Sequence, residues 1–122
     1  MRDEDRKILT EFLGERWHEI KGQTKGHGNK WMCTCHTTTG DGYWEKEDLI
    51  KHINNKNKRT FTTWEDFGAL WEKIDKKNLF ISWLHQDYYE YLLPEAWRRW
   101  ERERSKERCF IILEAIKEGV LK

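Results

Sequence analysis

Residues 61–74 read FTTWEDFGALWEKI, and this stretch decides the fold class. Its apolar residues recur at positions i, i+3, i+4 and i+7: Phe67, Leu70, Trp71 and Ile74. This spacing places them on one face of an α-helix. Two pairs ahead of them match a capping box, the motif that opens a helix: Thr62 with Glu65, or Thr63 with Asp66. The stretch therefore predicts an amphipathic helix over residues 63–77.

Helical patterns continue on both sides of this stretch. Residues 3–13 combine an acidic first turn with an apolar stripe, and residues 45–54 predict a shorter helix. Asn78 can begin another helix, which should break near Leu93 because a proline follows. The remaining segment is either one long helix or two helices joined near Ser105.

A β-hairpin is predicted between the first two helices. Residues 16–20 and 30–35 are short segments separated by three glycines, and the second segment alternates in the manner of a strand. The chain has 122 residues, the size of one ordinary domain. We therefore expect an α+β fold: a predominantly helical single domain over residues 1–122 with a small N-terminal antiparallel β-hairpin.

Composition excludes several classes of protein. The chain carries 23 Lys and Arg against 22 Asp and Glu, so its total charge does not attract nucleic acid or anionic membranes. No run approaches the roughly 20 apolar residues that span a bilayer, and the first residues lack the apolar core of a signal peptide. Three cysteines do not form a disulfide framework. We therefore expect a cytoplasmic protein that has no membrane partner.

One group of residues has metal-ligand chemistry. Its members are His18, Cys33, Cys35 and His36. Zinc prefers four nitrogen or sulfur ligands in a tetrahedron, and a hairpin can bring a histidine on one strand opposite a cysteine on the other. On a regular strand the backbones of Cys33 and Cys35 would lie about 7 Å apart, so both can bind one ion only if the chain bends. Alternatively, one cysteine is a ligand and His27 or His52 completes the site, or the cysteines are small buried apolar residues beside a hydrogen-bonded His18.

Catalytic patterns are weak in this chain. The one nucleophile and base pairing is Cys35 with His36 or His18, and neighbouring residues on a strand point to opposite faces. The glycines at 22, 26 and 28 match neither a P-loop nor a dinucleotide-binding fingerprint. The sequence therefore predicts a protein that is not an enzyme.

A local basic surface could meet nucleic acid. Residues 21–60 hold eight Lys and Arg against four acids. The candidate contacts are Lys21, Lys25, Lys30, Lys56, Lys58 and Arg59. Together with the metal ligands, these residues would form a zinc-stabilised nucleic-acid-binding module.

Aromatic residues are numerous enough to suggest a protein interface. Eight tryptophans are hard to bury in so small a domain, and exposed aromatic side chains are favoured interface anchors. The candidates for partner binding are Trp64, Trp97 and Trp100, with Arg98 and Arg99 beside them. The alternative is that all the tryptophans are buried.

The apolar residues of 110–116 occupy more than one helical face, so they pack either against a second copy in a homodimer or between the helices of residues 3–13 and 67–74.

Three blocks of the sequence resemble a known group of proteins. The blocks are LTEFLGERWHEI (9–20), WMCTC (31–35) and FTTWEDFGALWEKI (61–74), and they resemble small tailed-phage proteins similar to the phage ABA sandwich domain group. The sequence differs from that group in having Arg16 where a cysteine is common and a C-x-C rather than a C-x-x-C pair. The resemblance implies a phage origin and a compact domain.

The resemblance, small size and surplus aromatics lead to one functional expectation. We expect a non-enzymatic phage-type accessory protein that binds a macromolecule of its host, in particular a host protein, and acts as an inhibitor of a host defence system. The alternative is the zinc-stabilised nucleic-acid-binding module.

Overall fold

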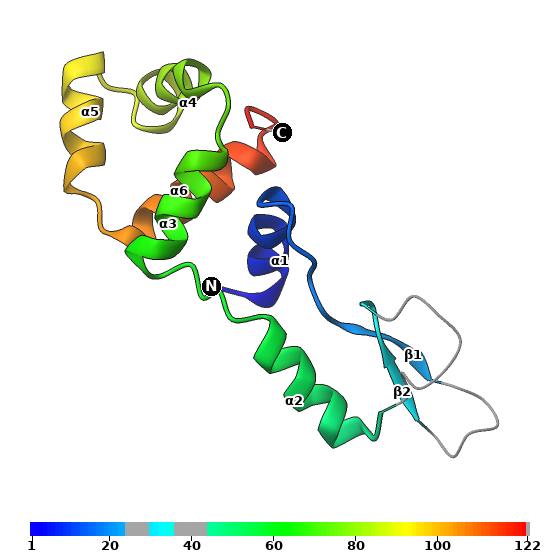
Figure 1. Cartoon of the computed structure of the whole chain (residues 1–122). Coiled ribbons are helices and arrows are strands. Elements are labelled where there is room, and N and C mark those ends of the chain that lie inside the picture. The colour runs from blue at the N-terminus through cyan, green and yellow to red at the C-terminus, as the bar shows by residue number, and fades with distance from the viewer. Residues whose placement is uncertain (24–29, 36–43, 122) are drawn as a thin grey trace. The chain divides into compact units, whose positions relative to one another are not determined.

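A computed structural model describes residues 1–23, 30–35 and 44–121 (Figure 1). It confirms an α+β fold that is predominantly helical with a small antiparallel hairpin near the N-terminus. The distances between Cα atoms divide the chain into two compact units. The helical unit comprises Met1–Leu13 with Thr60–Lys122, and the hairpin unit comprises Gly14–Arg59. That the whole chain forms a single domain stays a prediction, and each unit is described by itself.

The helical unit is built around its last helix. Its elements are α1 (Asp3–Phe12), α3 (Trp64–Lys73), α4 (Lys77–Trp83), a π-helix η1 (Leu84–Tyr88), α5 (Leu93–Arg102) and α6 (Ser105–Lys117). Both α1 and α3 pack against α6, where Ile111, Ile112 and Leu113 are buried. The chain itself therefore covers three of the apolar residues that could have met a second copy, whereas Phe110 is 46% exposed.

The N-terminus of α3 confirms one of the two predicted capping pairs. Thr63 is the N-cap, and its hydroxyl accepts a hydrogen bond of 3.2 Å from the backbone N–H of Asp66. The Asp66 carboxylate reaches back to the N–H of Phe61 at 3.0 Å, two residues before the N-cap. The predicted end of this helix, residue 77, is wrong. The helix stops at Lys73 because Ile74, the last residue of the apolar stripe, adopts an extended conformation, and α4 begins at Lys77.

The C-terminal segment consists of two helices, as one of the two alternatives had it. The break falls at Glu103 and Arg104, where the backbone is extended, and α6 begins at Ser105. The Ser105 hydroxyl donates to the carbonyl of Thr62 at 2.7 Å, which ties the start of α6 to the segment before α3.

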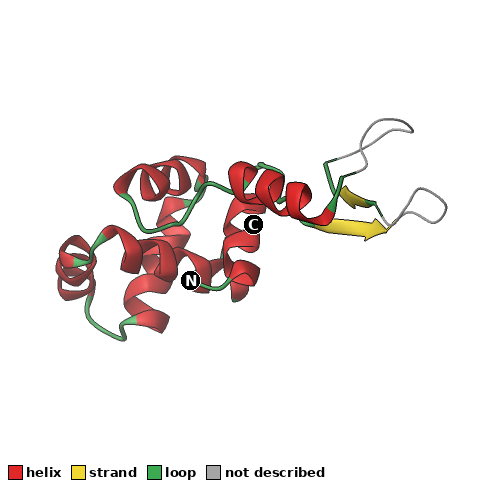
Figure 2. Cartoon of the chain, turned by 90° about the horizontal axis from the view of Figure 1, so that it is seen from below, coloured by secondary structure: helices red, strands yellow, loops and turns green. Residues whose placement is uncertain are grey.

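Among its described residues, the hairpin unit has two short strands and one helix; the strands are yellow in Figure 2. These elements are β1 (Ile20–Gln23), β2 (Trp31–Cys33) and α2 (Lys46–Lys56). The strands pair antiparallel with an irregularity between Ile20 and Gly22. The predicted first strand, residues 16–20, is therefore wrong in position, since β1 begins only at Ile20. Residues before it are held by side chains instead: the Thr34 hydroxyl donates to the carbonyl of Trp17 at 3.0 Å.

Candidate metal centre

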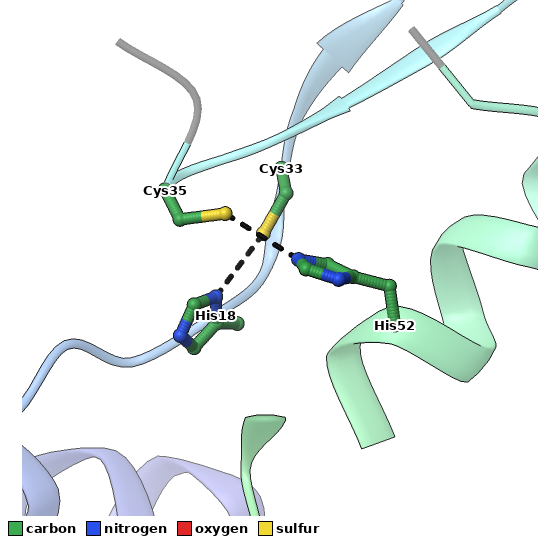
Figure 3. A group of neighbouring side chains, drawn as sticks. All are labelled: His18, Cys33, Cys35 and His52. Carbon is green, nitrogen blue, oxygen red and sulfur yellow. Dashed lines mark hydrogen bonds between the residues drawn. The ribbon is translucent and has the colours of Figure 1, made fainter. Parts of the chain in front are cut away.

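Four side chains of the hairpin unit bring their nitrogen and sulfur atoms together. They are His18, Cys33, Cys35 and His52, and one ligand atom from each lies within 4.8 Å of all the others (Figure 3). His18 comes from the loop before β1, the cysteines from β2 and the turn after it, and His52 from α2. Three segments that are distant in sequence therefore converge on one point.

The bend required between the two cysteines is present. Cys33 is the last residue of β2, and Thr34 and Cys35 form a turn rather than a continuation of the strand. Thr34 fixes this turn, because its N–H donates to the Glu19 carbonyl at 3.0 Å and its hydroxyl accepts from the Glu19 N–H at 3.2 Å. Both thiols can therefore face the same point.

Each histidine ring lies beside one cysteine sulfur. The Sγ of Cys33 lies 3.5 Å from Nδ1 of His18, and the Sγ of Cys35 lies 3.4 Å from Nε2 of His52. In a tetrahedral zinc site with Zn–S near 2.3 Å and Zn–N near 2.0–2.1 Å, a sulfur and a nitrogen are about 3.6 Å apart. The two observed distances match this value, and they are also those of a hydrogen bond between a thiol and an imidazole.

Burial shifts the pKa values of two members of the cluster, His18 and Cys35, towards their neutral forms. Burial lowers the pKa of the His18 imidazole, and the charge of the nearby His52 adds to the effect. Burial raises the pKa of the Cys35 thiol, and contact with Cys33 adds to that. A neutral imidazole is the form that binds a metal, whereas the thiols would release their protons as the ion binds. Two sulfurs and two imidazole nitrogens form a donor set that suits zinc, whereas magnesium and calcium prefer oxygen donors.

Three of the four predicted ligands, His18, Cys33 and Cys35, belong to this cluster. The fourth member is His52, which the sequence admitted as one alternative source of the fourth ligand. His36 and His27 lie outside the described residues. The His52 ring stacks on Trp44 with centroids 4.9 Å apart and stands edge-on to the His18 ring at 5.6 Å. The helical pattern of residues 45–54 was readable, but nothing in it showed which face meets the cysteines.

The predicted nucleic-acid contacts are spread over the hairpin unit. Lys21, Lys56 and Lys58 are exposed, and Lys30 is half-buried. Arg59 is bound to Glu15 through two hydrogen bonds of 2.8 Å, so part of its charge is neutralised. Lys25 lies outside the described residues.

The predicted partner-binding residues divide between the surface and the core. Trp64 is 56% exposed, and Arg98 and Arg99 are exposed, whereas Trp97 is half-buried. Trp100 is only 2% exposed, which removes it from any surface. It is buried because it fills the space between three rings of two other helices: Phe67 and Trp71 of α3 and Phe80 of α4 have their ring centres 5.2–5.9 Å from its own.

The surface of the helical unit has a hollow that was not predicted from the sequence. It encloses about 700 Å³ and is lined in part by Tyr88, Tyr89, Tyr91 and Phe110. The Tyr89 hydroxyl donates to the Glu103 carboxylate at 3.2 Å, and Arg99 pairs with the same carboxylate at 3.0 Å. The run of tyrosines was visible in the sequence, but the sequence did not show that Tyr88, at the end of the π-helix, and Tyr89 and Tyr91, after it, line one hollow.

Across the described part of the chain, no helix combines the length and the apolar character needed to cross a bilayer. Comparison with protein-family models, curated proteins and solved structures gives no match.

Proposed function

We propose that this chain is a non-enzymatic binding protein whose hairpin unit is a zinc-stabilised module. The observation that carries the proposal is the convergence of two cysteines and two histidines within 4.8 Å. Among the described residues of this unit, only Cys33 and Leu49 are buried apolar side chains. So small a core leaves a unit of this size marginally stable, and a structural zinc ion contributes about 10–16 kcal/mol of binding free energy in small zinc-binding peptides.

A structural role for the ion follows from the number of ligands. Catalytic zinc sites use three protein ligands and keep a position for water, whereas structural sites are closed by four. Four side chains converge here, so the protein would supply all four ligands of a bound zinc ion. This supports a role in folding and binding rather than in catalysis.

Metal content tests the proposal directly. The full chain purified without chelators should contain one zinc ion per chain, and Cys33→Ser or His52→Ala should reduce that content strongly. Cys109→Ala and His85→Ala are matched controls, because both residues belong to the helical unit and lie outside the cluster. Wild-type protein that binds no zinc, and whose stability is unchanged by a chelator, would refute the proposal.

Nucleic acid is the partner that the charge of the hairpin unit favours. This unit holds nine Lys and Arg against six Asp and Glu, whereas the helical unit holds 14 against 16. Binding through phosphates should weaken steeply as salt rises. We expect Lys56→Glu with Lys58→Glu to weaken binding to DNA or RNA and flatten its salt dependence, whereas Lys73→Glu with Lys76→Glu in the helical unit should not. Equal losses in both double variants would exclude a site on the hairpin unit.

A host protein is the second candidate partner, and the surface of the helical unit supports it. Leu92 is 75% exposed and Tyr91 51% exposed, and Tyr91 lines the hollow of about 700 Å³. Exposed apolar groups around a hollow are typical of protein interfaces. In this reading the chain is a phage-type accessory protein that inhibits a host defence system. The full chain should capture a specific protein from host lysate, and Tyr91→Ala with Leu92→Ser should abolish the capture; capture that survives these changes excludes this surface.

A further inference from the structure

Asn57 binds the backbone of one metal ligand, His18, and directly follows the helix that carries another, His52. Its side-chain oxygen accepts a hydrogen bond from the backbone N–H of His18 at 3.0 Å. Its side-chain nitrogen donates to the backbone carbonyl of the same residue at 2.7 Å. Asn57 also follows directly on α2, which carries His52, and its own N–H donates to the carbonyl of Ile53 at 2.9 Å.

The two side-chain hydrogen bonds copy the pairing of neighbouring β-strands. His18 lies in the loop of residues 15–19, ahead of β1, so no strand pairing of its own holds its backbone. The carboxamide of Asn57 supplies both the acceptor and the donor that a partner strand would supply. Only one orientation of this carboxamide fits, because the reversed one would set two N–H groups and two oxygens against each other.

We propose that Asn57 is a positioning residue of the metal centre, which sets the distance between His18 on the loop and His52 on α2. The inference rests on the proposed zinc site. A ligand that is already held in place loses less conformational freedom when the ion binds, so the affinity for the ion is higher. Residues that orient metal ligands without binding the metal typically change metal affinity by about 10–100-fold when they are mutated.

The side chain of asparagine is required by this arrangement. Asn57→Ala removes the donor and the acceptor together. Asn57→Asp keeps an acceptor for the His18 N–H but places a second oxygen against the His18 carbonyl. Asn55, an exposed residue of α2, supplies a matched control for the loss of an asparagine side chain from this end of the helix.

Zinc affinity of the full chain, measured by competition with a coloured chelator, provides the first readout. We expect Asn57→Ala to weaken zinc binding by about 10–100-fold, Asn57→Asp to weaken it less, and Asn55→Ala to leave it unchanged. Wild-type affinity in Asn57→Ala overturns the inference while leaving the zinc site intact. Wild-type protein that binds no zinc refutes the proposed function itself.

A double-mutant cycle separates positioning from a general loss of stability. If Asn57 acts through His18, adding Asn57→Ala to His18→Ala should weaken zinc binding little further. A purely structural role would instead make the two losses in binding free energy add.

Cobalt absorption at saturation supplies the second readout. The d–d bands of Asn57→Ala should change in position or intensity, because His18 is no longer held, whereas those of Asn55→Ala should match the wild type. Bands identical to the wild type in Asn57→Ala overturn the inference. If Asn57→Ala takes up no cobalt, the same comparison is made with Asn57→Asp, for which wild-type bands together with wild-type affinity overturn it.

Discussion

Arg108 lies against three aromatic rings of the helical unit. Its guanidinium carbon is 4.9 Å from the ring centre of Trp64, 5.2 Å from that of Phe67 and 5.3 Å from that of Trp100. The same guanidinium donates to the carbonyls of Glu101 and Glu103, at the end of α5. A planar cation with several donors can stack and donate at once, which a lysine cannot do.

We expect Arg108→Lys to lower the free energy of unfolding of the helical unit by about 2 kcal/mol, since stacking and charged hydrogen bonds are both reduced. Urea denaturation followed by tryptophan fluorescence measures this loss. Arg98→Lys, at an exposed position of α5, is the control and should change little. Equal stability of the two variants would show that the stacked guanidinium contributes nothing.

Cys109 is the buried thiol of the helical unit. Burial, together with the negative charge of Asp66, raises its pKa from 9.0 to about 12. The unfolded chain therefore loses this proton at lower pH than the folded chain does. The resulting stabilisation is fully present below pH 9 and disappears as the pH rises towards 12.

This shift predicts how stability depends on pH. The difference in unfolding free energy between wild type and Cys109→Ala should be constant below pH 9 and should narrow above it. Using the difference removes the contribution of Tyr88 and Tyr89, whose pKa values burial also raises. The native thiol should also resist iodoacetamide at pH 8 until the protein unfolds. A difference that is constant to pH 11, with fast labelling of native Cys109, contradicts this account.

At the scale of elements, the start of α3 depends on two side chains that hold backbone N–H groups. Thr63 caps the helix, and Asp66 binds the N–H of Phe61. Phe61 is fully buried and has a φ of 57°, a left-handed conformation that costs free energy in a residue with a side chain. The Asp66 carboxylate stabilises that conformation by pairing a buried N–H.

We expect Thr63→Ala to destabilise the helical unit by about 1 kcal/mol, the usual cost of losing an N-cap. Asp66→Ala should cost about 1–3 kcal/mol, because the N–H of Phe61 is left buried and unpaired. Glu65→Ala, in the same helical turn but exposed, should change the free energy of unfolding by less than about 0.5 kcal/mol. If Glu65→Ala cost as much as Asp66→Ala, the rival capping pair of the sequence analysis would be the important one. Thermal or urea denaturation provides the measurement.

For the whole molecule, the two units differ in what stabilises them. The buried apolar cluster consists of residues of the helical unit alone, from Leu9 to Leu121, and it includes Phe61, Phe80 and Trp100. The hairpin unit is held by the histidine and cysteine cluster and by a small number of hydrogen bonds among its described residues. Removal of zinc should therefore affect the units unequally.

Chelation of zinc from the full chain should collapse the amide NMR signals of residues 14–23, 30–35 and 44–59 into the range of an unfolded chain. Signals of the helical unit should keep their dispersion, because its core contains no residue of the metal site. Adding zinc back should restore the first set. Simultaneous loss of both sets would show that the units do not fold independently.

We expect the chain to sediment as a 15 kDa monomer. The physical reason is that α1 and α3 already cover Ile111, Ile112 and Leu113 of α6, the residues whose exposure would have favoured a homodimer. Sedimentation velocity at micromolar concentrations measures the mass. A shift towards twice this mass with rising concentration would contradict the expectation. The exposed Phe110 would then be the candidate residue for a dimer contact.

The sequence by itself determined the helices and the part of the metal site that is formed by His18 and Cys33. The stripe of residues 67–74 and the cap at Thr63 depend on neighbours within one or two helical turns, so the spacing of nearby residues is enough to predict them. The proximity of His18 to Cys33 follows in the same way from a hairpin. The ends of elements were less accessible, since α3 ends at Lys73 and β1 begins at Ile20, whereas the local pattern predicted residues 77 and 16.

Only the tertiary structure decided which residues complete the site and which tryptophans are buried. His52 lies far along the chain from His18, and it becomes a neighbour because α2 packs against β2 and because Asn57 holds the loop. The sequence made both Trp64 and Trp100 candidates for a partner-binding surface, yet Trp100 is buried and Trp64 is exposed. The physical reason is that burial and ligand geometry depend on contacts between elements, which short-range spacing does not specify.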